Sequence, residues 1–258
     1  MTVLQQEKQI AKQIKAFLTI KSPVANAINF VRDKSCRCVV FGGALRDIVH
    51  PDPVTPVVRD VDIVVSRDDI KNLKNQWPQH IAGTNRFGGL RLKIERVPVD
   101  VWAVEDTWAF RKAIVIPDSY YYLTRTTFLN IDGIIADLSP QYREGMKIFA
   151  KDFLYAFSER ILDITLEQNP YPLLVTIKSL RAVSRYNLGI GHALAQFLHG
   201  VLSRRQFKRL EKEQIRHYGR ILFDASYLDR MHKRLHEFLL YEWPMSIALS
   251  PQQQLRWW

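Results

Sequence analysis

The chain has 258 residues, 47% of them hydrophobic, so it is long and apolar enough to bury a core and is not predominantly disordered. It carries 37 lysines and arginines against 26 aspartates and glutamates, and this net charge of +11 favours a polyanionic partner, nucleic acid before an anionic membrane surface. No apolar run reaches the roughly 18 residues of a membrane span, and the polar N-terminus lacks a signal-peptide block. We therefore expect a cytoplasmic protein.

The first 50 residues predict helices and one strand. Cys36 and Cys38 lie two residues apart near that strand, too close for an easy disulfide and too few for a closed zinc site, so we expect them to be reduced and structural. In chain order the predicted elements are a helix over 4–18, a helix after Pro23, a strand over 37–41 that ends at Gly42-Gly43, and a helix over 44–49.

The next hundred residues predict further strands of a mixed sheet. Ser66 is placed to cap a helix, and Asp132-Gly133 is a strong hairpin signal. The predicted elements are a strand over 59–65, a helix over 67–77, strands over 90–95 and 97–104, and a hairpin that joins 127–131 to 134–138.

From about residue 151 the patterns become helical and glycine becomes rare. The predicted helices cover 153–166, 173–186, 192–202 and 204–217 and continue to about 240. The sequence therefore predicts two domains, a mixed α/β domain over 1–150 and an all-helical domain over 151–258.

Two carboxylates on one strand are the first chemical signal. Asp60 and Asp62 lie at positions i and i+2, so their side chains project from the same face, with backbones roughly 6 to 7 Å apart. Such a pair in an apolar strand can grip a hard cation such as Mg²⁺, and through it the phosphates of a nucleotide. The alternative is an edge strand with two solvated carboxylates.

A glycine turn precedes this strand. Gly42-Gly43 lies between a strand and a helix, where backbone N–H groups can approach a polyphosphate and the helix dipole favours its charge, and Arg46 lies one turn further on. Glycine pairs also mark ordinary turns, but a strand, Gly-Gly and helix followed within twenty residues by Asp-x-Asp is a specific combination.

These residues resemble the head domain of class II CCA-adding enzymes and bacterial poly(A) polymerases, members of the polymerase-β-like nucleotidyltransferase superfamily. The family pattern is Gly-Gly-x-x-Arg-Asp, a loop, and Asp-x-Asp with apolar neighbours. The matching residues are Gly42, Gly43, Arg46, Asp47, Asp60 and Asp62.

The resemblance implies an α+β fold, a nucleotidyltransferase head with a mixed sheet followed by an all-helical neck. It also implies that Asp60 and Asp62 are catalytic and carry Mg²⁺, that Gly42 and Gly43 contact the triphosphate, and that Arg46 and Asp47 support that loop in the nucleotide site.

The superfamily adds a third carboxylate from a neighbouring strand. By resemblance Asp100, in the strand over 97–104, is the expected third catalytic and metal-binding residue. A strand-edge charge is the alternative for Asp100, and Glu95, Glu105 and Asp106 are competitors for the role.

Two further family motifs are degraded. Arg125 and Asn130 are what remains of the second, where the resemblance implies contacts with phosphate and ribose; an exposed strand arginine and a turn asparagine are the alternative. In the third, Arg181 fits the motif on a predicted helix, but Lys178 replaces the first arginine and Leu174-Val175 replaces the acidic pair. The bidentate reading by which the family selects the base therefore cannot operate. Lys178 and Arg181 can still contact phosphates, or form an ordinary polar helix face.

A basic stripe in the helical half is suited to an RNA backbone, although such a run can also be a solvated face. Tyr218, Trp243, Trp257 and Trp258 could supply stacking surfaces. The stripe consists of Arg204, Arg205, Lys208, Arg209, Lys212, Arg216 and Arg220.

The sequence and the resemblance together predict a Mg²⁺-dependent nucleotidyltransferase that adds nucleotides from an NTP, ATP or CTP first, to an RNA 3′-hydroxyl, tRNA first, with release of pyrophosphate. A full CCA-adding enzyme is longer, so we expect a truncated or specialised relative, which could act as a toxin or defence factor instead of maintaining tRNA. A transferase that modifies a protein or a small molecule also fits the residues, as does an inactive relative that only binds RNA.

Overall fold

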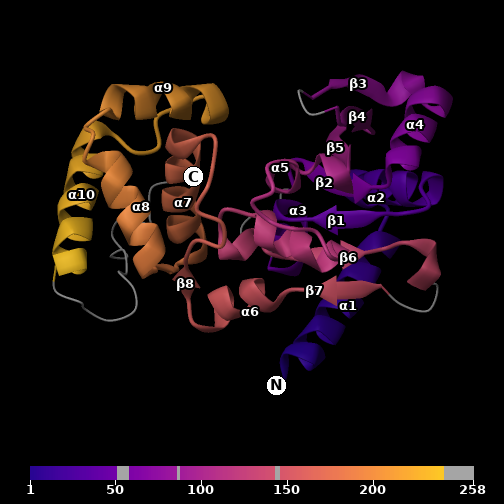
Figure 1. Cartoon of the computed structure of the whole chain (residues 1–258), viewed down its shortest axis with the longest axis horizontal. Helices are drawn as coiled ribbons and strands as arrows, with labels where there is room; N and C mark the ends of the chain where they lie inside the picture. Colours follow the sequence, from indigo (N-terminus) through magenta and orange to yellow (C-terminus); the bar gives the residue numbers. More distant parts are fainter. Residues whose placement is uncertain (51–57, 86–87, 143–145, 241–258) are drawn as a thin grey trace. The chain divides into compact units, whose positions relative to one another are not determined.

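The computed structural model describes residues 1–50, 58–85, 88–142 and 146–240, and Figure 1 traces their helices and strands. The chain forms two compact units. The first contains Met1–Thr127 and Ile131–Leu154, and the second contains Phe128–Asn130 and the residues from Tyr155 onward. The α+β class with a mixed sheet is confirmed.

The first unit is built on a seven-stranded sheet with the order β3-β4-β5-β2-β1-β6-β7. β2 and β5 run parallel, and the remaining neighbouring pairs are antiparallel. The strands are β1 (Val39–Phe41), β2 (Val61–Val65), β3 (Ile81–Thr84), β4 (Leu90–Ile94), β5 (Val97–Ala103), β6 (Ile135–Asp137) and β7 (Lys147–Phe149).

Three helices of this unit, α1, α2 and α4, begin at a residue whose side chain caps them. Thr2 and Ser66 form capping boxes, and the Ser22 hydroxyl accepts a hydrogen bond ahead of Pro23, which occupies the first helical turn. The α-helices are α1 (Val3–Thr19), α2 (Pro23–Lys34), α3 (Gly43–Val49), α4 (Arg67–Gln76) and α5 (Trp108–Arg111), and α6 (Lys151–Ser158) begins here. The 3₁₀ helices are η1 (Pro78–His80), η2 (Val104–Asp106), η3 (Tyr120–Thr126) and η5 (Pro140–Tyr142).

Apolar side chains on both faces of the central strands are buried. One face carries Val39, Val64 and Ile135, which pack with Phe110 and Leu123 from the segment between β5 and β6. The alternate residues of β1, β2 and β5 are also buried, and α2, α3 and α4 pack against these strands. The packed sheet therefore positions the residues at the strand ends.

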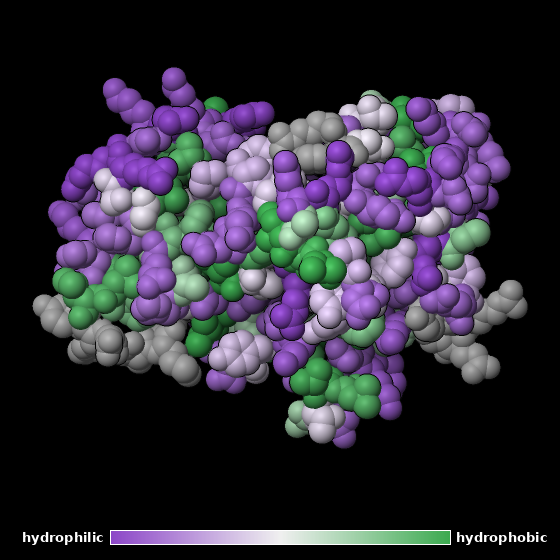
Figure 2. All heavy atoms as spheres, viewed as in Figure 1, coloured by the Kyte–Doolittle hydropathy of each residue, from purple (hydrophilic) through white to green (hydrophobic). Residues whose placement is uncertain are grey.

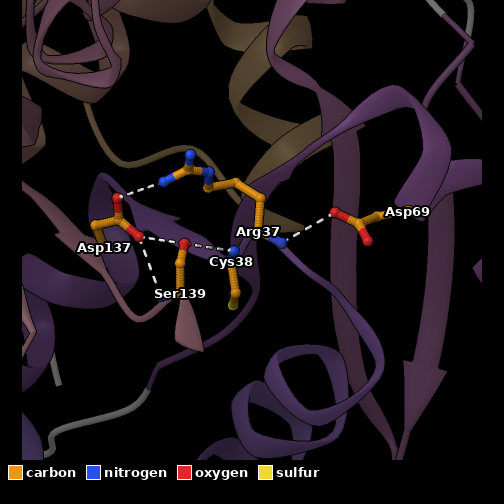
Figure 3. Close-up of polar contacts among 5 residues, drawn as sticks. All are labelled: Arg37, Cys38, Asp69, Asp137 and Ser139. Carbon is orange, nitrogen blue, oxygen red and sulfur yellow. Dashed lines mark hydrogen bonds and ion pairs between the residues drawn. The ribbon is translucent and has the colours of Figure 1, made fainter. Parts of the chain in front are cut away.

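Two buried carboxylates hold the chain at the entrance to β1 (Figure 3). Asp69 accepts a hydrogen bond from the backbone N–H of Arg37 at 3.1 Å, and the Arg37 guanidinium pairs with Asp137 at 3.3 Å. Ser139 hydrogen-bonds to Asp137 and accepts from the backbone N–H of Cys38 at 3.1 Å. These contacts fix the start of β1 and therefore the position of the glycine turn that follows it.

The second unit is helical except for one small sheet. Its core is formed by α7 to α10, and β8 and β9 pair in parallel. The elements are η4 (Asn130–Asp132), which begins here, β8 (Ile161–Leu162), α7 (Pro172–Tyr186), β9 (Gly189–Ile190), α8 (His192–Leu202), α9 (Phe207–Tyr218) and α10 (Ala225–Leu240).

Three sequence expectations about elements are wrong. The predicted hairpin across Asp132-Gly133 does not form: Phe128–Asn130 joins the second unit, where Leu129 bridges to Ile164, and only β6 enters the sheet. The helix predicted over 153–166 ends at Ser158, because Arg160 has a left-handed backbone (φ 56°) and β8 follows. The second half is therefore not entirely helical.

The two cysteines are free; Cys36 is exposed and Cys38 is buried, where desolvation raises the pKa of its thiol. Among the helices of the described ranges, none is long and apolar enough to cross a membrane.

Candidate active site

A row of carboxylates lies across two neighbouring strands. In the parallel pairing of β2 with β5, Asp62 is the direct register partner of Asp100, which places their backbones about 5 Å apart. Register partners project from the same face of a sheet. Both side chains are partly exposed, whereas Val61, Ile63, Val99 and Val101, their neighbours in sequence, are buried. Asp60 comes directly before β2 and is exposed.

The electrostatics of Asp100 reflect this crowding. Partial burial raises the pKa of Asp100; Arg91, whose Nε lies 3.6 Å from an Asp100 carboxylate oxygen, opposes the shift, and the charge of Asp60 adds to it. Asp60 itself pairs with Arg59 at 3.2 Å. Asp60 and Asp100 are thus close enough for their negative charges to repel each other. Such repulsion favours the binding of a cation between them.

Two of the competitors for the third carboxylate, Glu95 and Asp106, make other contacts. Glu95 follows β4 and accepts hydrogen bonds from the Asn26 amide, and Asp106 in η2 pairs with Arg67 at 3.2 Å. The sheet register therefore aligns Asp100, and neither of these two residues, with Asp62.

The glycine turn lies next to Asp62 on the side of β1, opposite to β5. Phe41, the last residue of β1, is the register partner of Asp62, and Gly42 follows it. Gly42 has φ 70° and ψ −133°, a backbone conformation that residues with a Cβ rarely adopt, and its N–H donates to the Ile134 carbonyl at 3.0 Å. The turn from strand to helix thus passes directly beside the carboxylate row.

Arg46 is held under this turn by two acids. Its Nε lies 3.0 Å from Asp47, and its terminal nitrogen pairs with Asp132. A Cβ on Gly43 would lie 3.4 Å from the Arg46 guanidinium, so the glycine lets this side chain pack closely against the turn. Sequence reasoning missed Asp132, because Asp132-Gly133 is a dipeptide typical of hairpin turns.

The residues fit a magnesium ion by donor chemistry. Carboxylate oxygens are the ligands that Mg²⁺ prefers, and this ion usually takes one or two protein carboxylates together with water and substrate phosphates. Over the ranges that the structure describes, no group of three histidine, cysteine or acidic side chains is arranged to hold a metal ion. Asp62 and Asp100 are the pair that the register supplies, with Asp60 two residues from Asp62.

The two degraded motifs fall in different units. Arg125 lies in η3 of the first unit, exposed, with its guanidinium 6.0 Å from the centre of the Tyr121 ring; a hydrogen bond with Tyr121 raises its pKa. Asn130 belongs to the second unit and is buried. Its amide donates to the Ile161 carbonyl at 3.0 Å and accepts from the Asp163 N–H at 3.1 Å, so here it holds the strand β8.

The basic residues of the second unit are on its surface. Lys178 and Arg181 are exposed on α7, and the Arg181 guanidinium stacks 4.8 Å from the centre of the Tyr218 ring on α9. Arg205 pairs with Asp229 at 3.1 Å. Figure 2 shows the hydrophilic surface over α9. All residues of the predicted basic stripe are exposed: Arg204, Arg205, Lys208, Arg209, Lys212, Arg216 and Arg220. The predicted stacking residues Trp243, Trp257 and Trp258 lie outside the described residues.

Solved structures of CCA-adding enzymes and of a tRNA nucleotidyltransferase are similar in fold to this chain. The Thermotoga maritima CCA-adding enzyme in complex with tRNA has a TM-score of 0.58 at 15% identity over 84% of this chain and 52% of its own. A CCA-adding enzyme in complex with CTP gives a TM-score of 0.57 at 15% identity, over 91% of this chain and 56% of that one.

A tRNA nucleotidyltransferase bound to a primer tRNA and an incoming ATP analogue gives a TM-score of 0.52 at 17% identity, over 81% of this chain and 60% of its own. This chain therefore spans between half and three-fifths of the length of these three structures. At these identities the likeness is one of fold. No family model matches the sequence, and no curated protein matches it.

Proposed function

We propose that this protein is a Mg²⁺-dependent nucleotidyltransferase that transfers nucleotides from an NTP to the 3′-hydroxyl of an RNA and releases pyrophosphate. The observation that carries the proposal is the parallel register that sets Asp62 beside Asp100, with the Gly42 turn next to Asp62 on the neighbouring strand. It is supported by the similarity in fold to CCA-adding enzymes, two of which are described in complex with CTP and with ATP.

The proposed role of each residue follows from the strand or turn on which it lies. Asp62 and Asp100, with Asp60 two residues from Asp62, would hold Mg²⁺, and the ion would supply charge neutralisation for the triphosphate and for the attacking and leaving oxygens. Gly42 and Gly43 bring backbone close to the triphosphate, and Arg46 with Asp47 keeps that turn in place. Asp100 lies on the far side of Asp62 from the turn, and there it would face an acceptor hydroxyl that approaches from the β5 side.

Residues outside this row are proposed for further nucleotide and RNA contacts. Arg125, Lys178 and Arg181 are exposed cations suited to phosphates, and Asn130 is assigned to the ribose by the resemblance alone. The exposed basic side chains around α9 bind the RNA backbone, as the net charge of +11 favours. We propose tRNA as the RNA, since similar folds are described in complex with tRNA, and ATP or CTP as the nucleotide.

The test is label transfer with a purified protein. The full chain is incubated with total RNA, Mg²⁺ and each α-labelled NTP in turn, and the product is divided between nuclease and protease digestion. The proposal predicts label in a tRNA-sized band that nuclease removes, dependent on Mg²⁺ and abolished by Asp62→Ala. Lys71→Ala, at an exposed site on α4, is the matched control and keeps full activity.

Protein modification and RNA binding without catalysis give different results in the same experiment. Label that protease removes would overturn the RNA acceptor in favour of protein modification. No label with any NTP, together with retained RNA binding, would overturn the enzyme and leave an RNA-binding module.

A further inference from the structure

The face of the sheet that carries the carboxylate row is covered only in part. The segment between β5 and β6 packs over Val39, Val64 and Ile135, on the side of β1, β2 and β6. Across β5 and β4 the side chains of this same face are exposed at Pro98 and Lys93. Within the described residues of the first unit, the carboxylates can therefore be approached along the sheet surface from the side of β4.

Two cations line that open surface. Arg91 on β4 is the register partner of Asp100, so Asp62, Asp100 and Arg91 form one row across three strands. Lys93 follows two residues along β4, on the same face and about 7 Å from Arg91. That separation is comparable with the distance between successive phosphates in an extended nucleic acid strand.

Arg91 is not locked in its contact with Asp100. Its side chain is 64% exposed, and the 3.6 Å separation from Asp100 is long for a charge-assisted hydrogen bond. An exposed arginine in a loose ion pair can exchange one anion for another at low cost, because an ion pair in solvent contributes little free energy. When Asp100 binds a cation, the guanidinium is free to take a phosphate instead.

The order of groups across the sheet assigns the two substrates to opposite sides. The Gly42 turn adjoins Asp62 from β1, and Arg91 adjoins Asp100 from β4. In-line transfer needs the attacking hydroxyl opposite the leaving pyrophosphate. With the triphosphate at the glycine turn, the acceptor strand comes from the β4 side.

We propose that the β4–β5 surface is the track of the acceptor, a single-stranded RNA 3′ end whose last two phosphates bind Arg91 and Lys93. This inference rests on the proposed function and extends it by naming two positioning residues. Transfer joins the acceptor 3′-oxygen to the α-phosphorus and breaks its bond to the β-phosphate oxygen, so the acceptor proton and pyrophosphate are the other products.

The experiment measures initial rates for the full chain at varied RNA and varied NTP concentrations. Arg91→Ala and Lys93→Ala are each expected to raise the KM for RNA roughly fivefold to tenfold, with the KM for NTP unchanged. Each is also expected to reduce the slope of log affinity against log salt by about 0.7, the value for one contact to a single strand. Arg91→Lys keeps the charge and restores most of the RNA affinity, and Lys71→Ala is the control.

The results separate failure of this inference from failure of the proposed function. If wild type transfers nucleotides to RNA but both alanine variants keep the wild-type KM for RNA, the track is wrong and the function stands. If Arg91→Ala lowers only kcat and Lys93→Ala has no effect, Arg91 merely holds Asp100 and the track is again wrong. If wild type transfers nothing to RNA, the proposed function itself is refuted, and the track with it.

Discussion

Replacing Gly42 with alanine tests why this position is a glycine. The residue is needed either for its backbone conformation or because a Cβ would clash with a neighbouring atom. A Cβ at this position would meet only the Asp132 carbonyl oxygen, at 3.9 Å, which is an ordinary contact. The cost therefore comes from the backbone, since φ 70° with ψ −133° is a region that L-residues rarely occupy. Holding alanine there costs about 1–3 kcal/mol.

The assay is urea unfolding of Gly42→Ala, followed by the tryptophan signal, beside activity at a temperature where the variant is fully folded. Gly200→Ala is the matched control: Gly200 lies in α8 with nothing within 4 Å of the added Cβ, so the same substitution is expected to stabilise by about 0.5–1 kcal/mol. We also expect Gly42→Ala to lose activity, because relaxing the strain moves the turn away from the carboxylate row. A variant with wild-type stability and wild-type activity would refute the reasoning.

Three further predictions concern stability. Gly191→Ala places a Cβ 2.4 Å from the Asp163 carboxylate and is expected to destabilise the second unit by about 1–3 kcal/mol, measured by urea unfolding; no loss would contradict the packing. Desolvation and the neighbouring His199 lower the pKa of His232, so the unfolded chain binds the proton more readily, and stability is expected to fall as pH drops below about 6.5. His232→Gln should flatten that dependence in thermal unfolding from pH 5 to 8, and an unchanged slope would exclude His232 as its source. Asp69→Ala removes the buried carboxylate that accepts hydrogen bonds from the backbone N–H groups of Cys36 and Arg37 ahead of β1, and it should lower the unfolding free energy by about 1–3 kcal/mol; a neutral result would contradict that anchoring role.

Local signals in the sequence predicted most of the first unit. Alternation and β-branched residues marked β1, β2, β4 and β5, and Ser66 and Pro23 marked the starts of α4 and α2. The strands β3 and β7 were missed, since each is short and lies at an edge of the sheet, where few apolar residues are needed.

The errors come from contacts distant in sequence. Residues 127–131 look like a strand, but Phe128 packs its ring 4.9 Å from that of Phe197, and Asn130 bonds to the backbone around β8. No local sequence pattern predicts that Phe128–Asn130 will pack in the second unit. The helix predicted past Ser158 failed for a similar reason, because Ile161 and Leu162 gain strand partners in β9.

The site was predictable in part. The spacing of Asp60 and Asp62 and the glycine turn were visible in the sequence, and the resemblance pointed to Asp100. Only the sheet register shows that Asp62 and Asp100 are neighbours, since pairing between β2 and β5 is set by the fold. Asp132 and Arg91 could not be assigned, because their relation to the site depends on strand pairing and turn geometry.

The central claim is that the carboxylate row transfers a nucleotide to an RNA 3′-hydroxyl. Its most direct test is the intact mass of a defined tRNA transcript after incubation with the protein, Mg²⁺ and ATP or CTP, compared with the same transcript whose terminal ribose has been oxidised. We predict that the intact transcript gains the mass of one or more nucleotides, that the oxidised one gains none, and that Asp62→Ala adds none to either. An equal gain on both transcripts, or a gain that survives Asp62→Ala, would contradict the account.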